Sequence, residues 1–193
     1  MDRRVLKTRK AIIDALVELL GERDLDQITI NDIADRANVN RGTVYLHYTD
    51  KYDLLDQCIE TYLQQLYESC MPNNGGTLQL TAKESLLLTF QYLEKHAYIY
   101  TMLLTRKGIP AFRNRLMTIM AQGIEEQIKI YGIKRGMNRD ITVQFLTSAA
   151  VGLVEWWIIQ SMPYPAEEMV EQLLALLSLH LPLPLPNEAI STG

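Results

Sequence analysis

Residues that build disulfide frameworks or zinc sites are scarce in this sequence. The 193-residue chain has 2 cysteines, Cys58 and Cys70, which form no Cys-x-x-Cys pair and have no histidine nearby at ligand spacing. Disulfide-stabilised domains and zinc modules need more cysteines at closer spacing than this. We therefore expect a reduced chain with no metal site and no cofactor.

Arrangements of catalytic side chains are missing as well. The 3 histidines, His47, His96 and His180, are scattered along the chain. Serine, histidine and aspartate occur in no nucleophile-elbow or paired-carboxylate pattern, and Gly75-Gly76 belongs to a plain loop rather than to a phosphate-binding motif. The sequence therefore does not favour an enzyme.

Long hydrophobic runs are also lacking. The N-terminus is charged and has no apolar block of the kind that signal peptides contain. The most apolar stretch, residues 145–159, is too short to span a bilayer and contains Glu155. We expect a soluble, cytoplasmic chain that does not enter a membrane.

Sustained alternation of β-branched residues is absent, whereas helical spacing recurs along most of the chain. The pattern predicts an all-α fold of about nine helices: three short ones, a connector that begins near residue 49, and a larger bundle. Capping residues predict helix starts at Thr29, Thr81 and Asn138, and Gly21 is expected to cap the C-terminus of the first helix.

Charge is distributed unevenly. Five of the first ten residues are Lys or Arg, although the whole chain has a net charge of −4. A basic end on an acidic chain can favour contact with a polyanion, and a solubilising tail would give the same pattern.

Residues 29–51 contain a short helix, a tight turn and a second short helix. Ile33, Ala34 and Val44 supply the inward faces, and Asn38 tolerates the left-handed conformation that ends a helix. Such a pair presents its second helix to the major groove of DNA. Small and polar groups suited to base edges begin that helix: Asn40, Arg41, Gly42 and Thr43.

The segment TINDIADRANVNRGTVYLHYTDKYDLL resembles the DNA-binding signature of the TetR/AcrR family of transcription regulators. The resemblance covers residues 8–55 and implies a helix-turn-helix domain over residues 1–50. The family's usual DNA contacts then fall on Thr29, Asn40, Arg41, Gly42, Thr43, Tyr45, His47 and Lys51. Tyr48 stands where the family usually has Phe and is expected to pack.

Different roles are expected for these residues. Arg41 and Thr43 would contact base edges, while Tyr45, His47 and Lys51 would contact phosphates, with Lys51 beside a helix N-terminus that attracts anions. The alternative is an ordinary helical hairpin in which the tyrosine and the histidine only pack.

The resemblance further implies a regulatory and dimerisation domain over residues 51–186, followed by a disordered tail, residues 187–193. The last two helices have apolar faces suited to a symmetric four-helix interface, and burial within the monomer is the alternative. The residues concerned are Ala149, Ala150, Gly152, Leu173, Leu174, Leu176 and Leu177. A homodimer would place two recognition helices on the half-sites of a palindromic operator in double-stranded DNA.

Two segments, HAYIYTMLLTRKGIPAFRNRL and GLVEWWIIQSMPYPAEEMVEQLL, resemble a C-terminal subtype that includes regulators of dihydroxyacetone metabolism in Gram-positive bacteria. This resemblance fixes no ligand. A ligand pocket is expected between the connector and the middle helices. Its candidate lining residues are Tyr98, Met102, Phe112, Met120, Phe145, Glu155 and Trp156, although methionines and aromatics at helical spacing more often form a core.

The family resemblance implies a repressor that a small-molecule effector releases from its operator. The effector would move the connector helix and so change the separation of the two recognition helices. The alternative is an activator or co-regulator that is controlled by a protein partner rather than by a small ligand.

Overall fold

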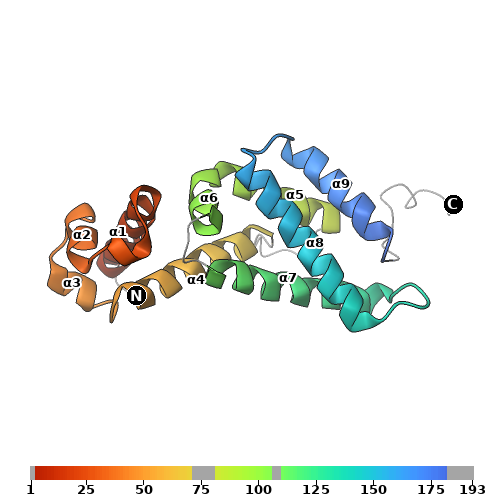
Figure 1. Cartoon of the computed structure of the whole chain (residues 1–193), viewed down its shortest axis with the longest axis horizontal. Helices are drawn as coiled ribbons and strands as arrows, with labels where there is room; N and C mark the ends of the chain where they lie inside the picture. The colour runs from red at the N-terminus through yellow and green to blue at the C-terminus, as the bar shows by residue number, and fades with distance from the viewer. Residues whose placement is uncertain (1–2, 71–80, 106–109, 182–193) are drawn as a thin grey trace. The chain divides into compact units, whose positions relative to one another are not determined.

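The computed structural model describes residues 3–70, 81–105 and 110–181 (Figure 1). Within these ranges the chain forms α-helices and one short 3-10 helix, with no strand, which confirms the all-α prediction. The elements are α1 (Arg3–Glu22), η1 (Leu25–Gln27), α2 (Ile30–Arg36), α3 (Arg41–Tyr45), α4 (Lys51–Cys70), α5 (Ala82–Lys95), α6 (Ala97–Thr105), α7 (Pro110–Tyr131), α8 (Arg139–Ile159) and α9 (Ala166–Ser178). The predicted disordered tail, residues 187–193, lies outside the described residues.

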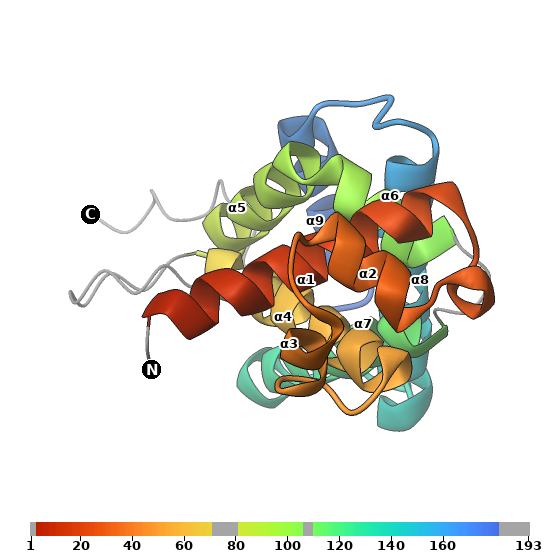
Figure 2. The same cartoon turned by 90° about the vertical axis from the view of Figure 1, so that its left-hand side faces the viewer.

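The chain divides into two compact units. The first contains Met1–Glu68 and His96–Arg113, and the second contains Ser69–Lys95 and Asn114–Gly193. Helices α1, α2 and α3 belong to the first unit together with α6 and most of α4 (Figures 1 and 2). The boundary after residue 50, between a DNA-binding domain and a regulatory and dimerisation domain, stays a prediction.

Helix α1 supplies the core on which the short helices pack. Its apolar residues recur at spacings of three and four, so that Ile12, Leu16 and Leu20 share a face and are at most 1% exposed. Ile33 of α2 and Val44 of α3 are both fully buried. Burial of each such side chain stabilises the fold by about 1.5–3 kcal/mol. The small helices are therefore held in place by packing rather than by their own length.

Gly21 does not end α1, contrary to the prediction, because the helix continues to Glu22. The glycine instead lies where the hydroxyl of Tyr98, on α6, approaches α1. A Cβ at position 21 would clash with that hydroxyl and would lie 3.5 Å from the sulfur of Met102. The missing side chain thus serves the packing of α6 on α1 within the first unit.

Three predicted helix starts are confirmed by hydrogen bonds. The Asp32 amide donates to Thr29 Oγ1 at 3.2 Å, and the Thr29 amide donates to Asp32 Oδ2 at 2.8 Å, which completes a capping box at α2. Thr81 and Glu84 form the same reciprocal pair before α5. The Ile141 amide donates to Asn138 Oδ1 at 3.1 Å at the start of α8. Local sequence chemistry sets these boundaries.

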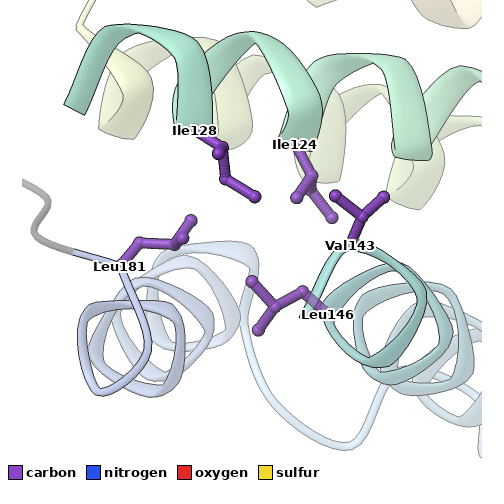
Figure 3. Close-up of a cluster of buried hydrophobic side chains, with 5 residues drawn as sticks. All are labelled: Ile124, Ile128, Val143, Leu146 and Leu181. Atoms are coloured by element: carbon purple, nitrogen blue, oxygen red, sulfur yellow. The ribbon is translucent and has the colours of Figure 1, made fainter. Parts of the chain in front are cut away.

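The second unit is a helical bundle in which α5 packs along α9. The rings of Phe90 on α5 and Trp157 on α8 meet edge to face with centroids 5.1 Å apart. Figure 3 shows a separate apolar cluster in which Ile124 and Ile128 of α7 point toward residues of α8 and of the segment after α9. Its other buried members are Val143, Leu146 and Leu181.

Helix α8 is long and apolar enough, by length and composition alone, to cross a membrane. However, 44% of its most apolar window is buried inside the protein, and these residues belong to the core of the second unit. A core helix of a bundle has this character. Several exposed residues of α8 are apolar as well: Ile141, Phe145, Trp156 and Ile159.

Candidate nucleic-acid interface

Helices α2 and α3 are joined by a tight turn, as predicted. Asn38 has φ +53°, the left-handed conformation expected of it, and the Val39 amide donates to the Ala34 carbonyl at 2.9 Å. Ala34 is 2% exposed, and its small side chain allows α2 and α3 to approach closely. Asn40 is the N-cap of α3, but its side chain makes no capping bond and is exposed. The turn therefore fixes the direction of α3 and leaves Asn40 facing solvent.

The outward residues of α3 form a prearranged polar surface. The guanidinium of Arg41 lies over the ring of Tyr45, 5.4 Å from its centroid, and its Nη2 donates to the tyrosine hydroxyl at 3.3 Å. Thr43 is half-buried beside them, and a Cβ added to Gly42 would meet no atom within 4 Å. The structure thus brings four of the predicted DNA contacts together on one exposed helix.

The side chains of His47 and Thr29 already contact other residues of the protein. The His47 ring meets the ring of Tyr48 edge to face, with centroids 6.2 Å apart, and is half-buried. The Thr29 hydroxyl donates to Asp32 Oδ2 at 2.7 Å, in addition to its part in the capping box. These hydrogen bonds lower the pKa of the Asp32 carboxyl below its usual value. A DNA contact by Thr29 would have to share a hydroxyl that already positions α2.

A polar chain ties the beginning of α4 to α1. Arg9 Nη2 donates to Gln57 Oε1 at 2.6 Å, and Gln57 Nε2 donates to Asp53 Oδ1 at 2.9 Å. The other oxygen of Asp53 accepts from the Thr49 amide at 2.8 Å. The bond from Gln57, followed by that from Thr49, lowers the pKa of Asp53 below its usual value. The segment between α3 and α4 is thereby fastened to the core of the first unit.

Tyr48 belongs to the core, as the sequence predicts. It is 1% exposed, and the Arg9 guanidinium lies 5.8 Å from its ring centroid. Burial raises the pKa of the phenol, an effect that the positive charge of Arg9 partly offsets. The hydroxyl has no hydrogen-bond partner among the residues that the structure describes. A phenylalanine would fill the same volume without burying this polar atom.

Replacing Tyr48 by Phe should therefore raise the free energy of unfolding by up to about 1 kcal/mol, because a buried hydroxyl without a partner is costly. Urea unfolding of the full chain measures this change. Tyr100→Phe is the matched control, since Tyr100 is also 1% exposed but its hydroxyl donates to the Tyr62 carbonyl at 3.0 Å. That variant should lose about 1 kcal/mol. Equal destabilisation by both variants would contradict the assignment.

Lys51 has partners other than the phosphate that the sequence suggests. Its Nζ donates to the carbonyl oxygens of Leu25, Asp26 and Ile28 at 2.9, 3.1 and 3.0 Å. An ammonium group has three N–H donors, so all of them are engaged. These carbonyls belong to η1 and to the residue after it. Lys51 therefore joins the start of α4 to the chain that leads into α2.

The N-terminus of α4 is internally capped too. Asp50 Oδ1 accepts from the Tyr52 amide at 2.8 Å and from the Asp53 amide at 2.9 Å. A carboxylate at this position neutralises the partial positive charge of the first turn. Asp50 thus binds the free amides of this helix terminus, and a phosphate contact by Lys51 stays a prediction.

The candidate pocket residues do not gather in one place. Phe112, which is 1% exposed, belongs to the first unit together with the half-buried Met102 and with Tyr98, which is 58% exposed. The rest, Met120, Phe145, Glu155 and Trp156, belong to the second unit. Phe145 is 56% and Trp156 is 42% exposed, which suits a surface rather than a closed pocket. The pocket stays a prediction without a defined location.

Family models match both parts of the chain. Residues 12–58 match the model described as bacterial regulatory proteins of the tetR family, and residues 81–179 match a transcriptional regulator C-terminal region of the same family. The chain belongs to the TetR family. It is a DNA-binding transcription regulator.

Similarity to other TetR-family proteins extends along most of the chain. The probable acrEF/envCD operon repressor of Escherichia coli K12 is 24% identical over 208 residues, which cover 96% of this chain and 90% of that protein. The uncharacterised regulator YxbF of Bacillus subtilis is 30% identical over 96 residues, 48% of this chain but only 25% of that protein. Both names describe transcriptional regulators.

Solved structures share the fold. A TetR regulator from Streptococcus agalactiae has a TM-score of 0.72 and 28% identity, covering 91% of this chain and 96% of its own. FadR from Bacillus subtilis, solved in complex with stearoyl-CoA, has a TM-score of 0.59 and 23% identity, covering 87% of this chain and 96% of its own. The arrangement of helices is therefore that of TetR-family regulators.

Sequence reasoning overlooked one exposed residue of the recognition helix. Leu46 follows Tyr45 directly and is 80% exposed. An apolar residue within a helical pattern is normally counted toward the core, and the position of Leu46 opposite the buried Val44 was the signal that could have found it.

Proposed function

We propose that this TetR-family regulator is a repressor that binds a palindromic operator as a homodimer and leaves it when a small molecule binds. The surface formed by Arg41 and Tyr45 on α3 supports the proposal most directly. Its DNA contacts would be Thr29, Asn40, Arg41, Gly42, Thr43, Tyr45 and His47. The proposal assigns no catalytic role to any residue and places the protein in the cytoplasm.

Arg41 and Thr43 would contact base edges in the major groove. A guanidinium forms paired hydrogen bonds with guanine, and a hydroxyl can bond with any base. Tyr45 and His47 would contact phosphates, which position the helix without reading sequence. The hydrogen bond between Arg41 and Tyr45 restricts the long arginine side chain before DNA binds, which lowers the entropy cost of the contact.

The exposed side of α8 supports dimerisation. Ile141, Phe145, Trp156 and Ile159 are 70%, 56%, 42% and 47% exposed, and helical spacing puts them on one stripe. Gly152 lies on the same stripe, and a Cβ there would meet no atom within 4 Å of it. A glycine at this position leaves room for the close approach of a second molecule.

The segments on either side of α9 border this stripe. Phe145 meets His180 with centroids 5.3 Å apart, and Trp156 meets Tyr164 with centroids 6.2 Å apart. Leu176 and Leu179 of this region are 52% and 61% exposed. The exposed residues of α8, of α9 and of its flanking segments thus offer a largely apolar surface for a symmetric four-helix interface, which we call the α8/α9 surface.

Of the other small and apolar residues that were predicted for this interface, some are exposed and some are buried inside the second unit. Ala149 is exposed, whereas Ala150 is 1% and Leu173 is 4% exposed and both pack inside the second unit. Leu177 packs against the cluster in Figure 3. Only part of the expected set is therefore free to face a partner.

An effector can release the repressor only if it binds more tightly to the dimer with one spacing of the recognition helices than to the dimer with the other spacing. The helix-turn-helix is fastened to α4 through Lys51 and Asp53, so a displacement of α4 would carry it along. FadR, which shares the fold, was solved in complex with stearoyl-CoA, and this supports control by a small-molecule effector. The chemical class of the effector for this chain is not implied by that complex.

Variants of α3 test the DNA contacts. Tyr45→Ala should lower affinity for specific and unrelated DNA alike, by about tenfold, because a phosphate contact carries no sequence information. Thr43→Val should instead change which sequences are selected. Operators selected from genomic fragments with the purified dimer, followed by gel shifts against an unrelated duplex, measure both effects. Unchanged affinity and unchanged selectivity in both variants would refute the assignment.

A further inference from the structure

Leu46 is the most exposed large hydrophobic side chain among the described residues, at 80%. It is the C-cap of α3, and its amide donates to the Gly42 carbonyl at 3.1 Å, so its backbone position is fixed by the helix. Single exposed leucines are common on protein surfaces and need no explanation alone. Leu46 differs from such isolated leucines because its side chain extends from the outward side of α3.

Helical spacing places Leu46 one turn after Gly42, on the side of α3 opposite Val44 and Tyr48. Those two side chains are 0% and 1% exposed and define the inward face. A Cβ added to Gly42 would meet no atom within 4 Å. Gly42 and Leu46 therefore lie on the side of α3 that faces away from the protein core, and we call them the outer ridge.

A recognition helix lies in the major groove with its N-terminal residues at the base edges, so the side of α3 away from the protein core is the one that can meet the floor of the groove. Hydrogen-bonding groups cover most of that floor, and its apolar group is the C5-methyl of thymine. Desolvating polar base edges against a leucine would be unfavourable, whereas contact with a methyl group removes apolar area from water. Asn40, Arg41 and Thr43 flank the ridge and can satisfy neighbouring polar edges.

We propose that Leu46 is a specificity-determining residue that contacts the C5-methyl group of a thymine in each half-site of the operator. The inference rests on the proposed function, because it requires α3 to enter the major groove. It adds an apolar contact to a surface whose other assigned contacts are polar, and it predicts a T·A pair at one fixed position of each half-site.

Removal of the methyl group tests this directly. An operator selected by the wild-type dimer from a random duplex library is synthesised with deoxyuridine in place of each thymine in turn, and affinity is measured by fluorescence anisotropy at one salt concentration. At one symmetry-related pair of positions the wild type should lose about fourfold in affinity per half-site, the effect of one buried methyl group. Leu46→Ala should bind more weakly and should not respond to deoxyuridine there.

Two further variants separate this contact from general damage to the protein. Leu46→Met keeps a flexible apolar side chain and should retain the response to deoxyuridine. Leu6→Ala removes another leucine, 50% exposed on α1, and should behave as the wild type. If wild type and Leu46→Ala lose the same factor at every position, the inference is wrong while the proposed function stands. If the wild type selects no sequence, both fail.

Discussion

Replacing Gly152 by Glu should dissociate the dimer and weaken operator binding by at least about a hundredfold, because each monomer would hold only one half-site and lose the high effective concentration of the second. The substitution adds a charge to the middle of the α8/α9 surface. It should not disturb the monomer, since a Cβ at position 152 meets no atom within 4 Å. Glutamate also favours helix more than glycine does, by roughly 0.5–1 kcal/mol.

Gly123 offers a matched control for this variant. It is an exposed glycine in the middle of α7, and a Cβ there also meets no atom within 4 Å. Gly123→Glu therefore makes the same chemical change outside the α8/α9 surface and should remain dimeric. Sedimentation velocity gives the oligomeric state and anisotropy gives the operator affinity. A dimeric Gly152→Glu protein with wild-type affinity would refute this interface.

Local chemistry made the helix-turn-helix predictable from the sequence. The capping box of Thr29 and Asp32, the left-handed Asn38 and the buried Val44 each involve residues within a few positions of one another, so that their spacing already determines their geometry. The exposed surface of α3 follows from the same short segment. The sequence predicts this segment correctly because its geometry depends only on neighbouring residues and not on contacts with distant parts of the chain.

Contacts between distant segments could not be predicted in the same way. Gly21 has the residue type of a helix cap, and only the position of Tyr98, on α6, shows that it serves close packing instead. Phe145 and Trp156 were expected in a pocket because α8 is apolar on nearly all sides, and such a pattern does not say which side is buried. The structure separates the inward Trp157, 0% exposed, from the outward Trp156.

The contacts of Lys51 are the clearest example of contacts that the sequence could not predict. Replacing Lys51 by Met should destabilise the protein. Its Nζ joins three carbonyl oxygens that lie 23 to 26 residues away in the chain, a set that no local pattern could reveal. Removing the ammonium leaves the carbonyls of Leu25 and Ile28, whose bonds are partly buried, without their donor, at a cost of about 2 kcal/mol in the free energy of unfolding. Urea unfolding measures it. Lys51→Arg should rescue little, because a planar guanidinium cannot direct three bonds from one nitrogen.

The salt dependence of DNA binding then separates a positioning role of Lys51 from a phosphate contact. A lost phosphate contact reduces the slope of log affinity against log salt by about 0.9, because fewer counterions are released. Since all three donors of Lys51 already bind carbonyls, Lys51→Met should weaken binding through the displaced helix-turn-helix yet keep the wild-type slope. Arg41→Ala, which removes a side chain assigned to base edges, should lower affinity for the selected operator more than affinity for an unrelated duplex. A reduced slope for Lys51→Met would mean that the lysine leaves its carbonyl partners when DNA binds.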